Sequence, residues 1–222
     1  MTTGRECAWA KRSLEEQVYH DTEWGVPTHE DSVLFEFLVL ETMQAGLSWT
    51  LVLKRREAMR EAFDGFDINK VAAYTPDKES QLLENPNIIR NRLKIASLRK
   101  NALAFKKIQA EFGSFDAYIW AFTNGESLVG HWQTEADVPA ITPLAEQISK
   151  DLKKRGFTFV GPTIVYSFLQ AIGMVNDHIV RLPLLWNGLT KRMESCNFMK
   201  FFIPTWTYSL QPIYLSDWHV SL

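Results

Sequence analysis

The chain has 222 residues, of which 46% are hydrophobic and 23% are charged, and its formal net charge at pH 7 is −2. This composition is typical of a globular protein with one domain, or with two small lobes that share a core. No apolar run is long enough to span a membrane, and the N-terminal residues lack the apolar segment of a secretion signal. Two cysteines, Cys7 and Cys196, are too few for a disulfide framework, so a reducing location, the cytoplasm, is predicted.

Helical periodicity dominates the chain up to His178 and alternation with a period of two is scarce, which predicts a mostly α fold. Gly25-Val-Pro27 breaks any earlier helix, and Asp31 or Ser32 is expected to cap a helix that ends at about Gln44. Further helices are predicted near residues 49–63, 68–74, 79–83, 88–112, 115–122 and 145–155. Residues 124–143 are richer in Gly, Thr and Pro and are predicted to form a surface loop.

One carboxylate stands among the apolar positions of the helix that ends at Gln44. This residue is Glu41. At helical spacing it shares one face with Leu34, Phe37, Leu38 and Ala45. A buried carboxylate is costly unless it is paired, protonated or bound to a ligand. Glu41 is therefore either a functional residue or a buried acid that is bonded to the backbone or to an Arg. Gly46 and Trp49 follow closely, and an acid, a Gly turn and a large aromatic residue at this spacing can line one pocket.

A second candidate site lies between two predicted helices, within residues 144–173. The segment from Gly156 to Gly161 is a short turn bounded by glycines, and Pro162 suits the first turn of the following helix. Three basic residues lie alongside: Lys153, Lys154 and Arg155. Backbone N–H groups at such a helix N-terminus suit a phosphate, so the pattern predicts that this unit holds a nucleic-acid backbone without reading sequence. The alternative is a helical hairpin whose glycines only form the turn.

Together these motifs resemble the 3-methyladenine DNA glycosylase I family of the helix-hairpin-helix superfamily. The resemblance covers roughly residues 7–181 and rests on ordered blocks: Cys7-Ala-Trp9, Tyr19-His-Asp-Thr-Glu-Trp-Gly-Val-Pro27, Leu40-Glu41, Gln44-Ala-Gly-Leu-Ser-Trp49, Ile88-Ile-Arg-Asn-Arg-Leu-Lys-Ile95, Leu152-Lys-Lys-Arg-Gly-Phe-Thr-Phe-Val-Gly161 and Val175-Asn-Asp-His178. It implies a helical glycosylase domain over residues 1–181, with the helix-hairpin-helix at about 145–173 and a sub-lobe that joins the termini. Residues 182–222 are then a divergent C-terminal tail.

The resemblance implies that the chain releases 3-methyladenine from alkylated, double-stranded DNA as a monomer, by hydrolysis and without a lyase step. Glu41 matches the acid that hydrogen-bonds the flipped base, and Tyr19 and Trp49 match aromatic residues that stack on it. Trp9 and Trp24 match residues of the pocket wall. A cationic methylated base is attracted to aromatic faces and to a carboxylate, and it is an activated leaving group, so no acid needs to protonate it.

The DNA contacts that the resemblance implies lie in two places. Gly46 and Leu47 match a loop that fills the gap left by the flipped nucleotide. The phosphate contacts fall on the hairpin and its flanks: Lys153, Lys154, Arg155, Gly156, Phe159, Gly161 and Thr163. Asp177 lies in the direction of an acid that bifunctional relatives use, but this family is thought to manage without it. We therefore expect Asp177 to be structural, for example as a helix cap.

The family also binds a structural zinc ion, and this chain keeps three of its four ligands: Cys7, His20 and His178. The fourth position is Leu182, whereas a structural zinc site normally has four protein ligands. Zinc is then lost, bound with a water ligand, or bound with Cys196 or His219 from the tail; without it the histidines would be ordinary core residues. The chemistry itself requires no metal. Smaller departures are Glu16, where an aromatic residue is possible, and Asn87, where Gly is usual.

Two functions compete on this evidence. The first is the glycosylase, which the acid and the stacking aromatic residues favour, because a plain DNA-binding module needs neither. The second is a catalytically impaired lesion- or DNA-binding protein of the same fold, since the missing ligand and the foreign tail would suit a degenerate copy. A helical scaffold unrelated to nucleic acid would leave the glycine-bounded hairpin without a purpose.

Overall fold

The structure is a computed structural model that describes residues 7–179, all of which lie in one compact unit, Met1–Leu182. The divergent tail, and with it Leu182, Cys196 and His219, falls outside the described residues. Within residues 7–179, no helix is both long enough and apolar enough to cross a membrane.

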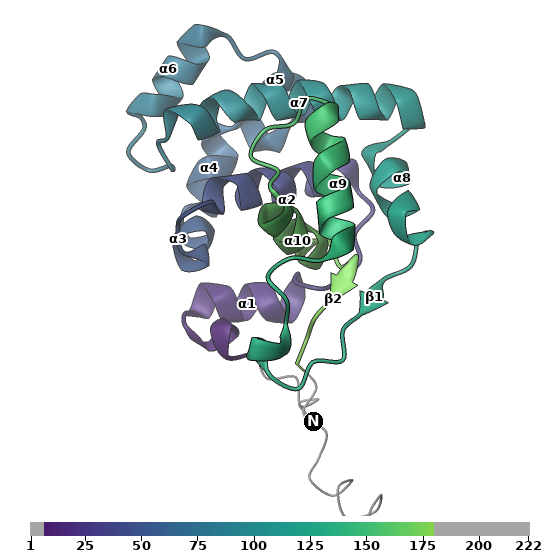
Figure 1. Ribbon diagram of the computed structural model, residues 1–222. Helices are drawn as coiled ribbons and strands as arrows, with labels where there is room; N and C mark the ends of the chain where they lie inside the picture. Colours follow the sequence, from purple (N-terminus) through teal and green to yellow (C-terminus); the bar gives the residue numbers. More distant parts are fainter. Residues whose placement is uncertain (1–6, 180–222) are drawn as a thin grey trace, which may run out of the picture. The chain divides into compact units, whose positions relative to one another are not determined.

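Most of the described chain is helical (Figure 1), so the predicted mostly α fold is confirmed. In chain order the helices, with η for 3-10 helices, are η1 (Ala8–Lys11), α1 (Leu14–Thr22), α2 (Asp31–Gln44), α3 (Trp49–Lys54), α4 (Arg56–Ala62), η2 (Asp64–Phe66), α5 (Ile68–Ala72), α6 (Pro76–Glu84), α7 (Arg92–Phe112), α8 (Phe115–Trp120), η3 (Ala121–Thr123), η4 (Glu135–Asp137), α9 (Pro143–Lys154) and α10 (Pro162–Ala171). Two short strands, β1 (Leu128–Val129) and β2 (Val175–Asn176), pair in parallel.

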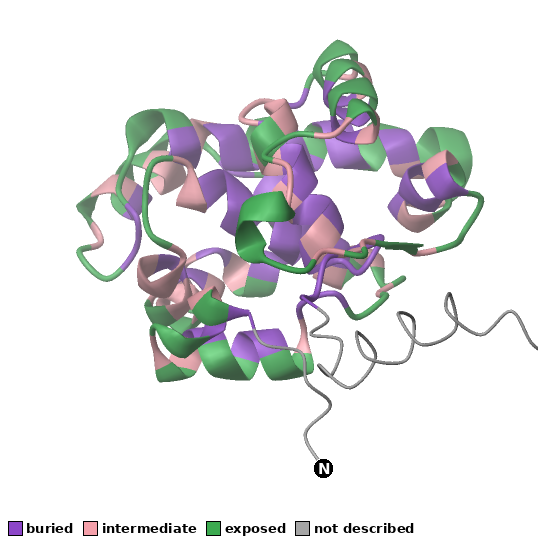
Figure 2. Ribbon diagram, turned by 60° about the horizontal axis from the view of Figure 1, so that its bottom comes forward, coloured by how far each residue is buried: buried purple, intermediate pink, exposed green. Residues whose placement is uncertain are grey.

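Helix α2 lies at the centre and contacts α3, α7, α8 and α10. Every residue from Leu34 to Met43 is buried, including the polar ones. A helix that is covered on all sides carries no single apolar stripe, so the face predicted from periodicity is only part of its buried surface. Figure 2 shows buried residues gathered where the helices meet and exposed residues on their outer sides. Because α2 is enclosed, a polar side chain on it faces either another helix or an internal cavity.

The start of α2 differs from the prediction, because neither Asp31 nor Ser32 caps it. Its N-cap position is Glu30, whose side chain makes no capping hydrogen bond. The Asp31 carboxylate instead accepts hydrogen bonds from the backbone N–H groups of Phe115 (3.0 Å) and Asp116 (2.9 Å). These are two of the N–H groups that a helix leaves unpaired at its N-terminus. Asp31 therefore ties α2 to the beginning of α8.

The helix predicted over residues 49–63 is divided into α3 and α4 at Arg55, which has φ −101° and ψ 0°. The Arg55 guanidinium donates to the carbonyl oxygens of Pro86 (3.0 Å) and Ile88 (2.6 Å), and so holds the chain before α7. Helix α7 begins at Arg92 rather than at residue 88 because the Asn91 side chain caps it. The predicted helix over 88–112 is therefore right in kind and four residues too long at its start.

The segment that follows α1 is locked to the end of α10. The Gly25 N–H donates to the carbonyl oxygen of Gln170 (3.0 Å), and the Thr28 N–H donates to that of Ile172 (3.1 Å). Gly173 has a positive φ of 72°, and a Cβ atom there would lie 2.3 Å from the backbone of Val26. Only Gly permits this close approach. The segment after α1 is thus fixed against the end of α10, and residues of both helices line one cavity.

Candidate active site

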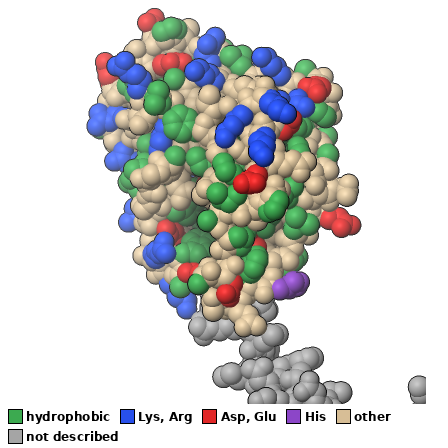
Figure 3. Space-filling model, in the orientation of Figure 1, with side chains coloured by type: hydrophobic (Ala, Val, Ile, Leu, Met, Phe, Trp, Pro, Cys, Tyr) green, Lys and Arg blue, Asp and Glu red, His purple; other side chains and the backbone are tan. Residues whose placement is uncertain are grey.

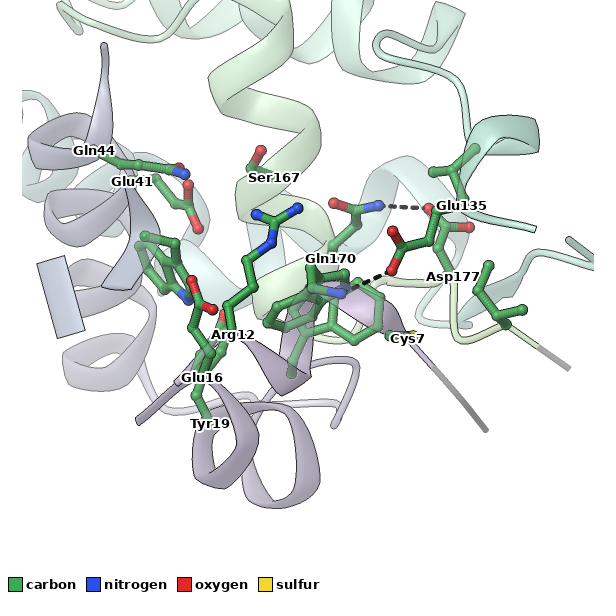
Figure 4. A pocket seen from close by; sticks show the side chains of 15 residues that line it. Cys7, Arg12, Glu16, Tyr19, Glu41, Gln44, Glu135, Ser167, Gln170 and Asp177 are labelled. Atoms are coloured by element: carbon green, nitrogen blue, oxygen red, sulfur yellow. Dashed lines mark hydrogen bonds between the residues drawn. The ribbon is translucent and has the colours of Figure 1, made fainter. Parts of the chain in front are cut away.

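A cavity of about 370 Å³ lies among η1, α1, the end of α2, the start of α3, and α10 (Figure 4). All five residues that the sequence assigned to base recognition line it: Trp9, Tyr19, Trp24, Glu41 and Trp49. Four of them come from separate helices and Trp24 follows the end of α1, so folding brings together residues that are up to 40 positions apart. The cavity is thus the natural candidate for a ligand site.

Glu41 projects into this cavity from the last turn of α2 and is 4% exposed. Burial away from water raises the pKa of Glu41 to about 8. Its Oε2 atom has no hydrogen-bond partner among the described residues, and the ion pairs found there do not include Glu41. The alternative of an acid neutralised by an Arg therefore does not hold for this part of the chain. A buried carboxyl group with an unused oxygen is a typical ligand contact.

Aromatic rings form the cavity wall around Glu41. The ring centroids of Tyr19 and Trp49 are 5.1 Å apart, and those of Trp9 and Trp24 are also 5.1 Å apart, both pairs meeting edge to face. The Tyr19 hydroxyl and the Trp49 Nε1 are buried and lack partners in the described chain. Burial first, and then the nearby Glu41, raise the pKa of Tyr19, so its phenol stays neutral. Aromatic faces beside a carboxylate attract a planar cation.

The turn between α2 and α3 carries Gly46 and Leu47. Gly46 has a φ of +76°, which suits Gly, and the Leu47 side chain is 39% exposed. At the base of this turn the buried Lys94 ammonium donates to the carbonyl oxygens of Met43 (2.8 Å) and Ala45 (2.7 Å). An exposed apolar side chain on a turn with a fixed base is well suited to enter a gap in a neighbouring molecule.

The turn between α9 and α10 has a bent backbone that α7 supports. Gly156 has a φ of +95° and Phe159 a φ of +56°. The Asn101 side chain accepts from the Thr158 N–H (2.8 Å) and donates to the Thr158 carbonyl oxygen (3.1 Å). The N–H groups of Phe159, Val160 and Gly161 find no acceptor within residues 7–179. Such a row of N–H groups beside the N-terminus of α10 suits an anion.

The basic residues that flank this turn differ in their availability. Lys153, Lys154 and Thr163 are exposed, and Figure 3 shows Lys and Arg side chains gathered where α7 and the end of α9 lie. The Arg155 guanidinium is instead engaged by carboxylates, with 2.7 Å contacts to both Glu111 and Asp151. Arg155 therefore braces the helices, whereas the two lysines point to solvent.

The sequence model of the methyladenine glycosylase family matches residues 9–183, which include every residue that lines the cavity except Cys7. The chain belongs to this family. It is 44% identical to "DNA-3-methyladenine glycosylase 1" of Escherichia coli (strain K12) over 174 residues, which cover 78% of this chain and 93% of the relative. It is 40% identical to "DNA-3-methyladenine glycosylase" of Haemophilus influenzae over 183 residues, which cover 82% and 98%.

Solved structures of family members agree with this assignment. The 3-methyladenine DNA glycosylase I of Staphylococcus aureus, whose structure addresses 3-methyladenine recognition, has a TM-score of 0.77 and 37% identity and covers 82% of this chain and 96% of its own. Another structure of 3-methyladenine DNA glycosylase I has a TM-score of 0.76 and 43% identity, with coverages of 78% and 95%. These structural matches therefore support both the helical fold and the family assignment of this chain.

Asp177 is not a helix cap; its carboxylate is held by three hydrogen bonds at the edge of the cavity. Its carboxylate accepts hydrogen bonds from Trp132 Nε1 (2.7 Å), from Gln170 Nε2 (2.7 Å) and from the Tyr166 hydroxyl. Three donors occupy most of the acceptor capacity of one carboxylate. Asp177 thereby ties the segment around Trp132 to α10 beside the cavity.

The zinc site that the resemblance implies is not supported in the described chain. The rings of His20 and His178 lie 4.8 Å apart, and Cys7 is buried. Within residues 7–179, however, no three His, Cys, Asp or Glu side chains are placed so that they could hold a metal ion. His20 Nδ1 contacts Asp21 and His178 Nδ1 contacts Asn176, each over 2.8 Å. The two histidines pack against Trp9 and Trp24 in an aromatic cluster.

Several cavity residues were not singled out as site residues from the sequence: Arg12, Gln44, Glu135, Ser167 and Gln170. Ser167 and Gln170 are three residues apart on α10, so they share one side of a helix that is otherwise mostly apolar. This pair of polar residues on an otherwise apolar helix is the sequence pattern that could have indicated them as site residues. Nothing local marked Glu135, which reaches η1 through a hydrogen bond from the Trp9 N–H (2.9 Å).

Proposed function

We propose that this chain is a DNA glycosylase that flips 3-methyladenine out of alkylated double-stranded DNA and hydrolyses its N-glycosidic bond. The observation that carries the proposal is the cavity in which aromatic rings surround Glu41, a buried carboxyl group with an unpartnered oxygen. The named relatives in E. coli and H. influenzae are 3-methyladenine glycosylases and match almost their full length. Cellular DNA as the substrate agrees with the cytoplasmic location predicted from the sequence.

Selection of the damaged base follows from the state of Glu41. With a pKa of about 8, Glu41 is mostly protonated at neutral pH while the cavity is empty. A cationic base favours the carboxylate form, because it replaces the solvation that burial removed. Normal adenine carries no charge and gains nothing from this exchange. A damaged base also costs less to unstack, so extrusion from the duplex adds to the selectivity.

The reaction breaks the bond between the base nitrogen and C1′ of deoxyribose. The bonding electron pair leaves with the base and cancels its positive charge, so no acid has to protonate the leaving group. The oxygen of a water molecule then bonds to C1′ and loses one proton to solvent, which leaves an abasic site. The enzyme contributes by binding the charged base on Tyr19, Trp49 and Glu41 and by holding the sugar in position for water.

The DNA-binding roles rest on the two turns described above. We assign Leu47 to the gap left by the extruded nucleotide, and the N–H groups from Phe159 to Gly161, with Lys153 and Lys154, to the phosphates beside it. Residues 1–181 would form the glycosylase domain, with the helix-hairpin-helix in α9 and α10. We also propose that the chain acts as a monomer.

The test is release of free 3-methyladenine from methylated duplex DNA, measured by chromatography. The wild-type chain is expected to release the base, and Glu41→Gln is expected to be slower by roughly 10- to 100-fold, as for the loss of one hydrogen bond to a charged group. Glu61→Gln is the matched control, because Glu61 is exposed and remote from the cavity lining. No release by folded wild-type protein that still binds DNA would favour the impaired DNA-binding protein instead.

A further inference from the structure

A second carboxylate, that of Glu16, lines the cavity that holds Glu41 (Figure 4). Glu16 lies on α1 and is 1% exposed. Its Oε1 atom accepts a hydrogen bond from the Thr50 hydroxyl on α3 over 2.9 Å. Its Oε2 atom is buried and has no hydrogen-bond partner among the described residues. A buried carboxylate oxygen that the protein leaves unused at a cavity is a candidate ligand contact.

Helix capping does not account for Glu16. Ser13-Leu-Glu-Glu16 has the spacing of a capping box, in which the glutamate side chain accepts a hydrogen bond from the serine N–H. Only the other half of that motif forms, with the Glu16 N–H donating to Ser13 Oγ over 3.1 Å. The carboxylate is turned toward Thr50, and the ion pairs of the described chain do not include it. Within residues 7–179, Glu16 therefore forms no ion pair, although the Arg12 side chain also lines the cavity.

The polar atoms of the cavity that lack hydrogen-bond partners together favour one class of ligand. Among the residues that line the cavity, four buried atoms lack hydrogen-bond partners in the described chain: Glu16 Oε2, Tyr19 Oη, Glu41 Oε2 and Trp49 Nε1. Two belong to carboxyl groups, one to a phenol and one to an indole N–H. This set offers acceptors for N–H groups and for positive charge, and one fixed donor for a ring nitrogen. It matches a planar, cationic, amino-bearing heterocycle.

We propose that Glu16 is a second base-recognising carboxylate, oriented by Thr50, and that Glu16 and Glu41 together select a cationic purine. The proposal rests on the glycosylase function given above. Cleavage returns an electron pair to the base, which becomes neutral. Two carboxylates therefore attract the base while it is attached to DNA and lose most of that attraction after cleavage, which favours release of the product.

The experiment compares kcat/KM for release of 3-methyladenine from methylated duplex DNA by the full-length chain. Glu16→Gln removes the charge and keeps an oxygen for Thr50, and is expected to lower kcat/KM roughly 10- to 100-fold. Its affinity for an unmethylated duplex is expected to stay unchanged, because Glu16 lies within the cavity. Thr50→Val is expected to have a smaller effect, which largely disappears in the Glu16→Gln background because Thr50 acts through Glu16.

Glu15→Gln is the matched control, since Glu15 is the neighbouring carboxylate of α1 and does not line the cavity. A Glu16→Gln variant that works within twofold of wild type overturns the proposal. Equal losses of base release and of unmethylated-duplex binding overturn it as well, because they indicate a damaged fold. If the wild type releases no base, the glycosylase function fails, and binding of the permanent cation 3,9-dimethyladenine, followed by tryptophan fluorescence, tests Glu16 separately. Equal affinity of wild type and Glu16→Gln for that cation then refutes the inference.

Discussion

The Lys94 ammonium donates a hydrogen bond to the carbonyl oxygen of Ala45 over 2.7 Å and a second to that of Met43 over 2.8 Å. These carbonyls belong to the end of α2, where a helix leaves its last C=O groups unpaired. A cation at this end also interacts favourably with the helix dipole. One side chain from α7 therefore fixes the place where α2 stops and the turn with Gly46 and Leu47 begins.

Replacing Lys94 with Met keeps most of its volume and removes both hydrogen bonds. We expect a loss of roughly 1.5–3 kcal/mol in the free energy of unfolding, the range for hydrogen bonds that involve a charged group. Urea unfolding monitored by circular dichroism measures the change. Lys100→Met, at an exposed position of the same helix, should remain within about 0.5 kcal/mol of wild type. Equal stability of the two variants would show that the Lys94 contacts contribute nothing.

The stability of the ligand-free protein should fall as the pH rises from about 4.5 to about 8. Burial raises the folded-state pKa of Glu41 from 4.5 to about 8, so the folded state binds more protons than the unfolded state in that window. Each pH unit then removes at most about 1.4 kcal/mol from the free energy of unfolding. Glu41→Gln should flatten this dependence and be the more stable protein at pH 8. Identical pH profiles of the two proteins, from denaturant titrations, would contradict the raised pKa.

Sequence patterns predicted the helical class, the end of α2 at Gln44 and the residues that share the cavity, because these depend on local periodicity and on recognisable blocks. They did not predict the break at Arg55 or the role of Asp31. Both depend on partners distant in the chain: Arg55 reaches carbonyl groups more than 30 residues away, and Asp31 caps a helix that starts more than 80 residues later. No local pattern encodes such contacts.

The same reasoning separates the two carboxylates of the cavity. Glu41 was recognisable from the sequence because it interrupts an apolar face. Glu16 was not, because Ser13 three residues earlier gives it an ordinary helix-capping explanation, and Thr50 is far away in the chain. Arg155 likewise belonged to a basic run, and only the structure shows its contacts with Glu111 and Asp151.

Salt dependence should distinguish the basic residues beside the turn between α9 and α10, to which we assign phosphate binding. Lys153→Gln is expected to reduce the slope of log Kobs against log salt concentration for duplex DNA by about 0.9, the value for one lost phosphate contact. Arg155→Gln should leave that slope nearly unchanged and lower the melting temperature instead, since its guanidinium binds two carboxylates. Fluorescence anisotropy over a series of salt concentrations gives both slopes. An equal reduction by the two variants would mean that Arg155 leaves its ion pairs when DNA binds.

Two glycines with positive φ should respond differently to alanine. At Gly113 the added Cβ meets open space, so only backbone strain of roughly 1–2 kcal/mol is expected. At Gly173 it would lie 2.3 Å from backbone atoms of Val26 and Pro27, which adds overpacking of about 1–3 kcal/mol. Thermal unfolding of both variants tests the difference. Similar melting temperatures would mean that the Val26 segment shifts at little cost.

In the proposed complex, helix α10 would set the distance between the DNA phosphates at the turn after α9 and the base in the cavity. It begins at Pro162, directly after the turn between α9 and α10, carries Ser167 and Gln170 into the cavity wall, and ends beside Gly173. Ten residues span about 15 Å, and each further residue would add about 1.5 Å and rotate the helix by roughly 100°. One inserted alanine would therefore leave both ends of the helix intact while the anchored backbone no longer aligned with the entrance to the cavity. If the turn binds phosphates as proposed, the length of this helix decides which nucleotide along a bound strand reaches the cavity.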